Sequence, residues 1–558
     1  MRQEMPTYAN TQEVDFVIVG SGAAGGVMAM ELARAGFDVV VMEQGPFVDQ
    51  TTFIDHDDFA QFIDLKYWGG AKGEHVQTFR ASPDEEAQAV GFPAAIYGRL
   101  VGGSSVFFAA NYWRFHEIDF KERSVLGPIA GTNFADWPLT YADLEPYYTR
   151  VDWEIGVSGG SGPFDPPRSK PYPLPPMPVK SSGVLFERGA RALGWHPQPS
   201  PVAILSKTHN GRAACTHCGH CWGMGCEMGA KSSSLAAAIP VALQTGKCEV
   251  RAESTVMRID TNDQNRVHQI VYLDRDGVEH AQKTKAVIVS ANGAETPRLL
   301  FLSASSQHPD GLSNGSGMVG KNLMFNGAPI CNGVFEQPLN EYKSIQSTRM
   351  LIDFYDTDPN RGFYGGGGLD ARFFPSSPIL SAAGVIPGSM SPDTPGWGQG
   401  FKDALAHDYI RTMTIMGHTT SLPLETNNIT LDPEARDKWG RPALRVTYKD
   451  HPDDLAAMQF MIDRAKEVFE AAGATKVWAP DIVPQTVGAH LLGTCRMGDN
   501  PETSVVDKYH RSHEVDNLFI CDGSSLVTSG RGQPTMTIQA LAFRAAEHIA
   551  EFARKGEI

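Results

Sequence analysis

The chain has 558 residues, of which 42% are hydrophobic and 20% are charged. This balance excludes a disordered chain, and the length predicts two or more domains. Lys and Arg number 48 against 64 Asp and Glu, so the formal net charge is −16, which disfavours nucleic acids and anionic membranes as partners.

The start of the sequence carries no predicted membrane-spanning or export segment. The longest uncharged run near the start, residues 16–30, is short and rich in glycine, unlike a bilayer-spanning helix. The residues before it lack the apolar core of a secretory signal. We therefore expect no transmembrane segment and no export signal in this sequence.

The first predicted elements have the order of a dinucleotide-binding fold. A β-branched apolar run at residues 14–19 ends in the sequence Gly-Ser-Gly-Ala-Ala-Gly. A helical pattern at residues 27–35 and a second apolar strand at residues 39–42 follow, and Glu43 closes that strand. Strand, GxGxxG, helix, strand and acid in this order predict a nucleotide cofactor.

Each residue of the glycine motif has an expected role. Gly20 permits the tight turn, Gly22 lets the backbone approach a pyrophosphate, and Gly25 lets the helix pack closely on the strand. Glu43 is expected to accept hydrogen bonds from the ribose hydroxyls, which disfavours a 2′-phosphate. The glycines alone do not separate FAD from NAD.

Four of the eight cysteines crowd into one short stretch. The spacing C-x2-C-x2-C-x4-C is formed by Cys215, Cys218, Cys221 and Cys226. Short spacings of this kind let thiolates converge on an iron–sulfur cluster or on zinc, and His217 and His220 could replace a cysteine in either site. A loop with disulfides or free thiols is the third interpretation, and all three stay open.

Two later apolar strands end in small or acidic residues. Residues 286–290 lead into Asn292, and residues 518–521 lead into Asp522 and Gly523. Ligands of doubly wound sheets bind at the carboxyl ends of the strands, so we expect these residues at a binding site. The sheet is therefore predicted to combine segments that are far apart in the sequence.

The composition changes between about residues 326 and 484. Residues 428–432 and 444–448 are predicted to be two strands joined by a turn, and residues 453–472 a helix that ends at Gly473. Residues 362–400 are rich in Gly, Pro and Ser and carry the aromatic residues Phe363, Tyr364, Phe373, Phe374 and Trp397. A mobile lid, a packed surface loop and a docking face are the three interpretations of that segment.

Further motifs follow one another in a recurring order along the chain. They are GRLVGGSS at residues 98–105, WPLTYADLEPYY at 137–148, HLLGTCRMG at 490–498 and SVVD at 504–507. Together with the first glycine motif, they resemble the glucose–methanol–choline (GMC) family of flavin oxidoreductases. Within the family, the chain is most similar to fructose and gluconate dehydrogenase-type catalytic subunits, in residues 113–114, 290–297, 319–322 and 505–508. The cysteine cluster also resembles that of this branch and of related long-chain alcohol oxidases.

The resemblance implies an α/β fold with two parts. One is a doubly wound, Rossmann-like FAD-binding domain, and the other is an α+β substrate domain built on an antiparallel sheet, of which the hairpin at residues 428–448 resembles a part. We expect the FAD-binding domain, with its cysteine-rich loop 215–226, at residues 11–160, 200–325 and 485–558. The substrate domain and its connectors are expected at residues 161–199 and 326–484.

The resemblance also implies FAD-dependent oxidation of a CH–OH group. His490 matches the catalytic histidine of the family, and a neutral imidazole suits the removal of a hydroxyl proton. Gln533 stands where the family has a second His or Asn. It either holds the substrate oxygen or braces the flavin through its backbone.

The expected cofactor is dissociable, non-covalent FAD. Some relatives attach FAD through a histidine just after the second glycine motif, where this chain has Val106, Phe107 and Phe108. The two phenylalanines are expected either beside the flavin or in the core. The residues predicted to bind FAD are Gly20, Gly22, Ala23, Gly25, Glu43, Arg99, Gly102, Gly103, Ser104, Asn292, Asp522, Gly523, Pro534 and Thr535.

Similar sugar dehydrogenases hold a three-iron cluster with three cysteines, and the cluster relays electrons from FAD to a cytochrome. Their cysteine spacing differs from that of this chain, in which Cys221 and Cys226 match best. Cys215 or Cys218 would be the third ligand, and a four-iron cluster on all four cysteines is equally open.

The resemblance leaves three functions to compare. The first is a dehydrogenase for an alcohol, sugar or aromatic alcohol, with a cytochrome c or quinone acceptor and a small partner subunit. The second is an oxidase that reduces O2 to H2O2, and the third is a non-catalytic electron-transfer or docking subunit. The expected location is the cytoplasm, or the periplasmic side of a membrane after transport with a partner.

Overall fold

The computed structural model describes residues 5–69, 76–373, 378–384 and 388–558. Its main sheet has the strand order β6-β2-β1-β9-β8-β7, and β17 also pairs with β9. The strands are β1 (Val14–Val19), β2 (Val39–Met42), β6 (Cys248–Arg251), β7 (Thr255–Thr261), β8 (Val267–Leu273), β9 (Glu279–Val289) and β17 (Leu518–Ile520). Strands β6, β2, β1, β9 and β17 pair in parallel, which confirms a doubly wound sheet built from distant segments.

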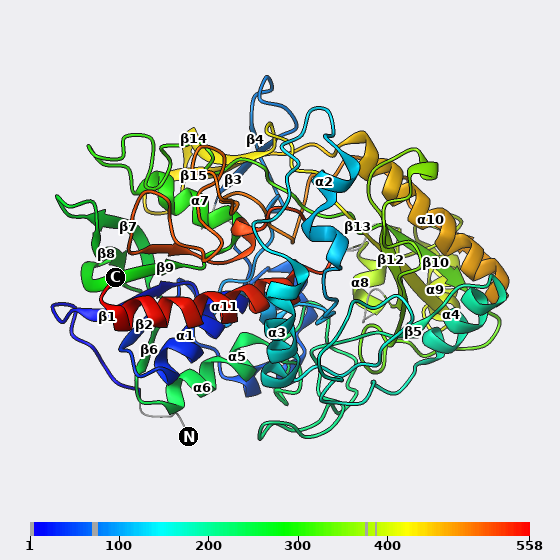
Figure 1. Ribbon diagram of the computed structural model, residues 1–558. Coiled ribbons are helices and arrows are strands. Elements are labelled where there is room, and N and C mark those ends of the chain that lie inside the picture. Colours follow the sequence, from blue (N-terminus) through cyan, green and yellow to red (C-terminus); the bar gives the residue numbers. More distant parts are fainter. Residues whose placement is uncertain (1–4, 70–75, 374–377, 385–387) are drawn as a thin grey trace.

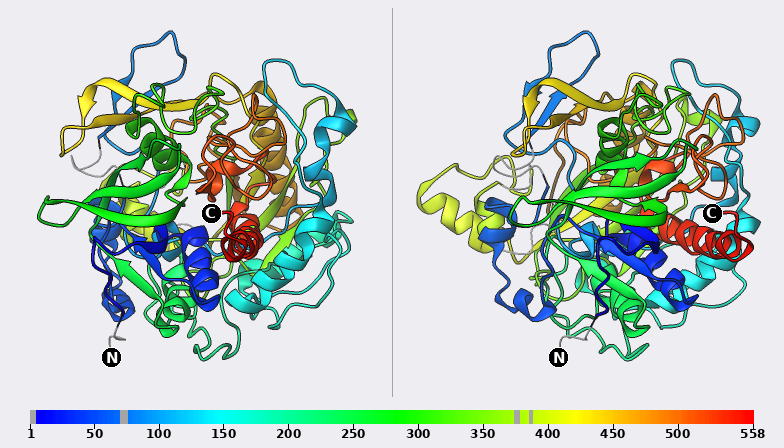
Figure 2. Two further views of the ribbon diagram at one scale, coloured as in Figure 1. Left: turned by 60° about the vertical axis from the view of Figure 1, so that its left-hand side comes forward. Right: turned by 90° about the vertical axis from the view of Figure 1, so that its left-hand side faces the viewer.

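Helices α1 (Ala23–Arg34) and α11 (Pro534–Lys555) lie side by side against this sheet, as Figures 1 and 2 show. Helix α11 also packs on α3 (Tyr141–Val151), and α1 packs on α6 (Ile239–Gln244) and α5 (Ser234–Ala237). On another side, α7 (Asn292–Leu302) packs on β7. The first strand, the glycine turn and β2 form where the sequence predicts them, whereas α1 begins at Ala23, four residues before the predicted start, and ends at Arg34.

A second, fully antiparallel sheet has six strands in the order β16-β10-β13-β12-β11-β5. The strands are β5 (Gln198–Pro199), β10 (Ile330–Val334), β11 (Arg349–Leu351), β12 (Gly367–Arg372), β13 (Thr412–Thr419) and β16 (Lys476–Trp478). Helices α10 (Pro452–Ala472) and α4 (Ser181–Ala192) cover one face of this sheet. Helix α10 ends at Gly473, whose φ is +81°, as the sequence predicts.

The predicted hairpin is present, but it belongs to a third sheet. Strands β14 (Asn428–Arg436) and β15 (Pro442–Thr447) pair with each other, and β15 pairs in parallel with β3 (Gln77–Arg80), which pairs with β4 (Gln88–Ala89). The antiparallel sheet that holds cavity-lining residues is the six-stranded one. The third sheet joins residues from both predicted domains, and the predicted domain boundaries stay a prediction.

The interpretation of residues 362–400 as one loop or lid is wrong for residues 367–373. Strand β12 is a buried inner strand of the six-stranded sheet, and Phe373 at its end is buried too. Helices α8 (Pro378–Ala382) and α9 (Gly398–Asp408) follow and project from the rest of the fold in Figure 2. Trp397 is 87% exposed. Phe374 lies outside the described residues.

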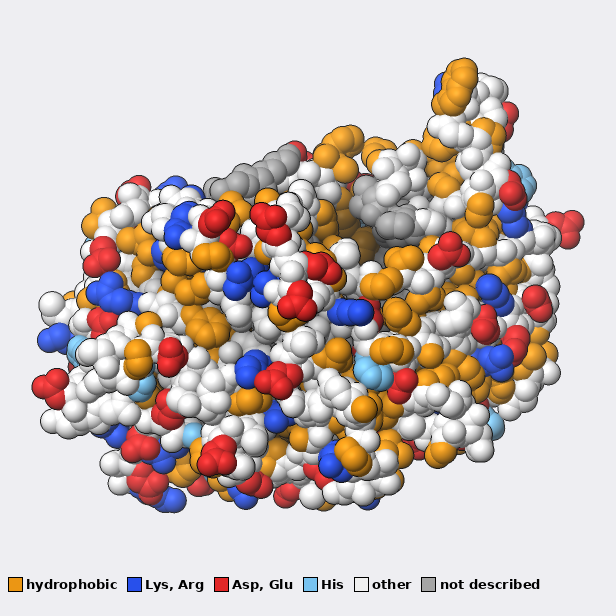
Figure 3. Space-filling model, turned by 90° about the horizontal axis from the view of Figure 1, so that it is seen from above, with side chains coloured by type: hydrophobic (Ala, Val, Ile, Leu, Met, Phe, Trp, Pro, Cys, Tyr) orange, Lys and Arg blue, Asp and Glu red, His pale blue; other side chains and the backbone are white. Residues whose placement is uncertain are grey.

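Across the described parts of the chain, every helix is too short or too polar to cross a bilayer. The short helix α2 (Glu122–Leu126) is one of these helices. Figure 3 shows charged side chains of both signs scattered over one face, with hydrophobic side chains gathered around a hollow near its centre.

Candidate active site

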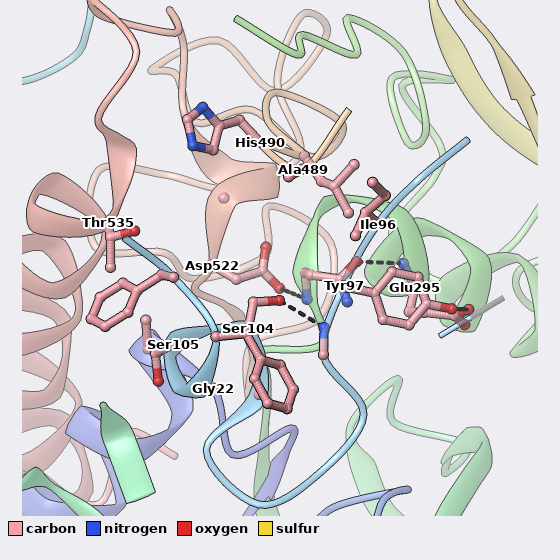
Figure 4. Close-up of a pocket in the computed structure, with 18 of the residues that line it drawn as sticks. Gly22, Ile96, Tyr97, Ser104, Ser105, Glu295, Ala489, His490, Asp522 and Thr535 are labelled. Atoms are coloured by element: carbon pink, nitrogen blue, oxygen red, sulfur yellow. Dashed lines mark hydrogen bonds between the residues drawn. The ribbon is translucent and has the colours of Figure 1, made fainter. Parts of the chain in front are cut away.

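A cavity of about 790 Å³ lies between the carboxyl ends of the parallel strands and one face of the six-stranded sheet. This size suits a bound cofactor or small ligand. The predicted site residues that line the cavity are Gly20, Gly22, Ala23, Glu43, Gly103, Ser104, Asn292, His490, Asp522, Gly523, Gln533, Pro534 and Thr535. Figure 4 shows Asp522 and Ser104 pointing into the space between Gly22 below and His490 above.

The glycines of the first motif meet different constraints. A Cβ atom at Gly20 would lie 2.4 Å from the carbonyl oxygen of Ser290, and one at Gly25 would lie 2.0 Å from that of Gly20. A Cβ atom at Gly22 would meet nothing within 4 Å, and Gly22 lines the cavity. Packing therefore requires Gly20 and Gly25, whereas Gly22 leaves space for a ligand at the N-terminus of α1.

Glu43 is held at the end of β2 by the glycine turn. Its carboxylate accepts hydrogen bonds from the Ser21 hydroxyl at 2.7 Å, the Ser21 amide at 3.2 Å and the Gly45 amide at 3.0 Å. Burial raises the pKa of Glu43, and these hydrogen bonds oppose the rise. Oε2 accepts both bonds from Ser21 and Oε1 accepts only the one from Gly45, so Oε1 can still accept a further bond and the expected ribose contact is compatible with this arrangement.

The second glycine motif reaches the first. The Ser21 hydroxyl also accepts a hydrogen bond from the Gly102 amide at 2.9 Å, and Gly102 has a φ of +99°. Gly103, with a φ of +55°, lines the cavity beside Gly22. Gly25, Gly102 and Arg99 were predicted to bind FAD, but the structure places them outside the cavity wall, where Gly25 and Gly102 shape the turns.

The predicted strand-end residues come together as expected. Asp522, after β17, accepts hydrogen bonds from the Asn292 amide at 3.0 Å, the Thr296 hydroxyl at 2.6 Å and the Ser524 amide at 2.7 Å. Burial raises the pKa of Asp522 against these bonds. The carboxyl ends of β9 and β17 therefore present one polar group to the cavity.

Aromatic side chains line another part of the wall, among them Phe107 and Phe108, which the sequence placed either beside the flavin or in the core, and Phe62, Trp68 and Trp222, which it did not assign to the site. Phe107 is buried and lies 5.2 Å from Trp68, ring centre to ring centre, and Phe108 also lines the cavity. Phe62 stacks on Trp222 at 5.3 Å, and both line the cavity. The open glycine turn, the strand-end acids and these flat apolar walls fit an FAD molecule.

His490 stands on the cavity wall and is half-buried. Burial, with a smaller contribution from the nearby His418, lowers the pKa of His490 from its ordinary value of 6.5 to about 4. The imidazole is therefore neutral at physiological pH and able to accept a proton.

Gln533 belongs to a buried polar network that the sequence did not predict. Its side-chain nitrogen lies 2.9 Å from Nδ1 of His418, and Nε2 of His418 lies 2.8 Å from the carboxylate of Asp370. Asp370 also pairs with Arg372 and accepts a hydrogen bond from the Asn111 amide at 2.8 Å. Burial raises the pKa of Asp370, but Arg372 and His418 outweigh it and keep the carboxylate ionised.

Sheet register explains why the sequence concealed this network. On β12 and β13, Gly368 lies opposite His418, so Asp370 and Arg372 fall on the same face as His418. Arg372, Met416 and His418 line the cavity, while Leu369 and Ile415 on the other face pack in a hydrophobic core. No local motif marks these residues, because their association depends on the pairing of two strands.

The cysteine loop lies next to the cavity. Trp222 and Gly223 line the cavity, and the Gly223 amide donates to the Phe107 carbonyl at 2.8 Å. Cys221 is buried and Cys218 is exposed, so the loop extends from the cavity wall to the surface. All eight cysteines lie in described parts of the chain and are free thiols. Of the third interpretation, the structure therefore agrees with free thiols and not with disulfides.

The loop does not form a tetrahedral set of sulfurs. Among described residues, one set of three His, Cys, Asp or Glu ligand atoms lies within 4.8 Å of one another, and it is His56, Cys218 and Glu227. Four thiolates on one zinc ion would stand about 3.8 Å apart, given a Zn–S bond of about 2.3 Å. Thiolates that bind different irons of a cluster stand farther apart. The observation therefore disfavours zinc held by four cysteines but does not disfavour an iron–sulfur cluster.

Comparisons with known proteins agree with the fold. The chain is 36% identical to 2-methyl-1,2-propanediol dehydrogenase of Mycolicibacterium austroafricanum, with 97% of this chain and 96% of the relative covered. It is 29% identical to the gluconate 2-dehydrogenase flavoprotein of Pantoea cypripedii, with 99% and 96% covered. The crystal structure of pyridoxine 4-oxidase from Mesorbium loti matches with a TM-score of 0.64 at 18% identity, covering 96% of this chain and 99% of that one.

The sequence profiles of GMC oxidoreductases match residues 14–326 for the N-terminal part and residues 423–542 for the C-terminal part. These ranges contain the glycine turn, the cysteine loop, His490 and Gln533. The chain therefore belongs to the GMC oxidoreductase family, whose members include FAD-dependent alcohol and sugar dehydrogenases.

Proposed function

We propose that this chain is an FAD-dependent dehydrogenase that oxidises a CH–OH group and passes the electrons to a separate acceptor. The observation that carries the proposal is a neutral His490 on the wall of the cavity that also contains the FAD-binding turn and Gln533. A base, a polar holding group and a cofactor site in one cavity are what alcohol oxidation needs.

The chemistry assigns one task to each group. Bound FAD supplies the acceptor for the two electrons that leave the alcohol carbon as a hydride. His490 takes the hydroxyl proton, so the alcohol loses two hydrogens and becomes a carbonyl. Gln533 holds the oxygen of the alcohol, and the aromatic wall excludes water from the reacting atoms.

A small substrate with more than one hydroxyl is the substrate that we propose. The similarity to a propanediol dehydrogenase supports this class. The side-chain oxygens (Oδ1) of Asn111 and Asn326 support it as well. Both residues line the cavity, and neither oxygen accepts a hydrogen bond from any described residue. Hydroxyl groups of the substrate or of FAD would supply those donors.

Non-covalent FAD is part of the proposal. The chain has Val106, Phe107 and Phe108 where some relatives have the histidine that attaches FAD, and none of these three side chains can form such a bond. An iron–sulfur cluster on the cysteine loop is a further part. It would be held by Cys221 and Cys226 with Cys215, Cys218 or both, and it would supply one-electron transfer toward an acceptor.

Two basic side chains support the iron–sulfur proposal. The ammonium of Lys231 donates to the carbonyl of Cys221 at 2.5 Å and to that of Met224 at 2.6 Å, inside the loop. Arg212 is half-buried near Cys226. Positive charges at these places would offset the negative charge of thiolates and cluster.

A cytochrome c or a quinone is the proposed acceptor, with a small partner subunit. The location that we propose is either the cytoplasm or the periplasmic side of a membrane after transport with that subunit. An oxidase that makes H2O2 is the second candidate function, and the 29% identity of the chain to the paromamine 6'-oxidase of Streptomyces fradiae supports it.

The test is anaerobic spectroscopy of the FAD-loaded protein. Diols and polyols are mixed with it without oxygen, and loss of the flavin absorbance is followed in time. Reduction without O2, with fast reoxidation by a quinone or cytochrome and slow reoxidation by O2, supports the dehydrogenase. Fast reoxidation by O2 with stoichiometric H2O2 supports the oxidase, and no reduction by any alcohol contradicts both.

A further inference from the structure

The position of Gln533 raises a physical problem that the structure resolves. Glutamine has one more rotatable bond than asparagine and no ring, so its amide needs a partner to hold one orientation. In the structure, the side-chain nitrogen of Gln533 lies 2.9 Å from Nδ1 of His418. The amide is therefore tied to strand β13 of the six-stranded sheet.

The hydrogen-bond network fixes the tautomer of His418. Nε2 of His418 lies 2.8 Å from the carboxylate of Asp370, which can only accept, and 3.2 Å from the guanidinium of Arg372, which can only donate. The shorter contact, with Asp370, assigns the proton to Nε2. Nδ1 is then an acceptor, and Gln533 must direct an N–H toward it rather than its carbonyl oxygen. Arg372 and Asn111 hold Asp370 ionised in its place.

The imidazole of His418 is also sterically confined. The ring of Trp113 meets it edge to face, with ring centres 5.0 Å apart. A Cβ atom at Gly532, whose φ is +85°, would lie 2.8 Å from the Cβ atom of His418. His418 is 4% exposed, so it has little room to rotate away from Gln533.

We infer that His418, held by Asp370, is a positioning residue that fixes the amide of Gln533 toward the alcohol. One N–H of the amide is committed to His418, and the second N–H and the carbonyl oxygen remain for the substrate. This inference rests on the proposed alcohol oxidation. His418, on β13, acts on the reaction through Gln533, which lies at the start of α11.

A double-mutant cycle tests the inference. The variants are His418→Phe, which keeps a ring beside Trp113, Gln533→Ala and the double variant, all loaded with FAD. The rate of anaerobic flavin reduction by a diol that reduces the wild type is measured at saturating diol. We expect His418→Phe to lower this rate 10- to 100-fold and the double variant to be no slower than Gln533→Ala alone. Multiplying effects of the two substitutions would overturn the inference.

Two controls keep the experiment decisive. His308→Phe removes another buried imidazole, which bonds to Asn265 at 2.7 Å away from the cavity wall, and it should reduce at the wild-type rate. If His418→Phe does not bind FAD, His418→Leu replaces it, because leucine is smaller and also offers no acceptor to Gln533.

A crystal structure of FAD-loaded His418→Phe, or of its replacement, tests the inference without any substrate. We expect the Gln533 amide to be displaced or to occupy two conformers. An unchanged single conformer would overturn the inference. Failure of the wild type to be reduced by any alcohol would instead contradict the proposed function and leave this structural test in force.

Discussion

Gly103 lies directly against Gly22, and a Cβ atom on Gly103 would be 3.0 Å from the Cα atom of Gly22. The two glycines belong to motifs that are far apart in the sequence, and both line the cavity. The same contact is reinforced by the Ser21 hydroxyl, which accepts from the Gly102 amide and donates to Glu43. The cofactor turn is therefore one unit built from two segments. A side chain added there would either clash with the protein backbone or occupy space meant for the ligand.

Substitutions at Gly22 and Gly25 should separate these two effects. Gly25→Ala places a Cβ atom 2.0 Å from the backbone oxygen of Gly20, so it should lower the melting temperature of the FAD-free protein. Gly22→Ala meets no protein atom within 4 Å and should leave that temperature unchanged while weakening FAD binding at least tenfold. Thermal unfolding and FAD titration measure both, and an equal effect of the two variants on FAD-free stability would contradict this reading.

His490→Ala should abolish most of the alcohol oxidation without loss of FAD. Removing a general base typically costs about 10² to 10⁴ in rate. The rate of flavin reduction by alcohol is the measurement, and reduction by dithionite is the control because it needs no base. A variant that is reduced by alcohol at the wild-type rate would show that His490 is not the base.

The pH dependence of activity should show a base with an unusually low pKa. His490 must be neutral to accept a proton, and burial lowers its pKa to about 4. Activity should therefore be constant from about pH 8 to pH 5.5 and fall tenfold per pH unit only below about pH 4. The profile of kcat/KM reports this ionisation, and a fall centred near the ordinary value of 6.5 would contradict it.

Asp370→Asn should destabilise the protein strongly. It leaves the buried guanidinium of Arg372 without its carboxylate, and loss of one partner of a buried pair costs about 3–5 kcal/mol. Glu425→Gln breaks an exposed pair with Lys321 and should cost about 1 kcal/mol or less. Urea unfolding of both FAD-loaded variants compares the two costs, and equal midpoints would show that Asp370 adds no stability.

Local motifs explain what the sequence could predict. The first strand, glycine turn, helix and second strand are contiguous, so their spacing alone places Gly20, Gly22 and Glu43. The pairing of His418 with Asp370 depends on the register of β12 and β13, and its contact with Gln533 crosses 115 positions. Propensity also failed for residues 367–372, because burial in a sheet made a strand from a glycine-rich stretch.

The cysteine loop gives the last prediction. If the loop holds an iron–sulfur cluster, protein purified without oxygen should contain about three or four irons per chain and show a reducible broad absorption beside the flavin bands. Cys221→Ser should remove the iron and slow reoxidation by a cytochrome at least tenfold, while FAD content and flavin reduction by alcohol stay unchanged.

Cys248→Ser is the matched control, since Cys248 is a buried thiol in β6, outside the loop. It should keep the iron of the wild type. Wild-type protein with FAD but neither iron nor a reducible broad absorption would contradict the cluster, and electrons would then have to leave the flavin directly. Because Trp222 and Gly223 of the loop line the cavity, a loss of iron that also lowered FAD content would place the cysteines in the cofactor wall instead of in an electron path.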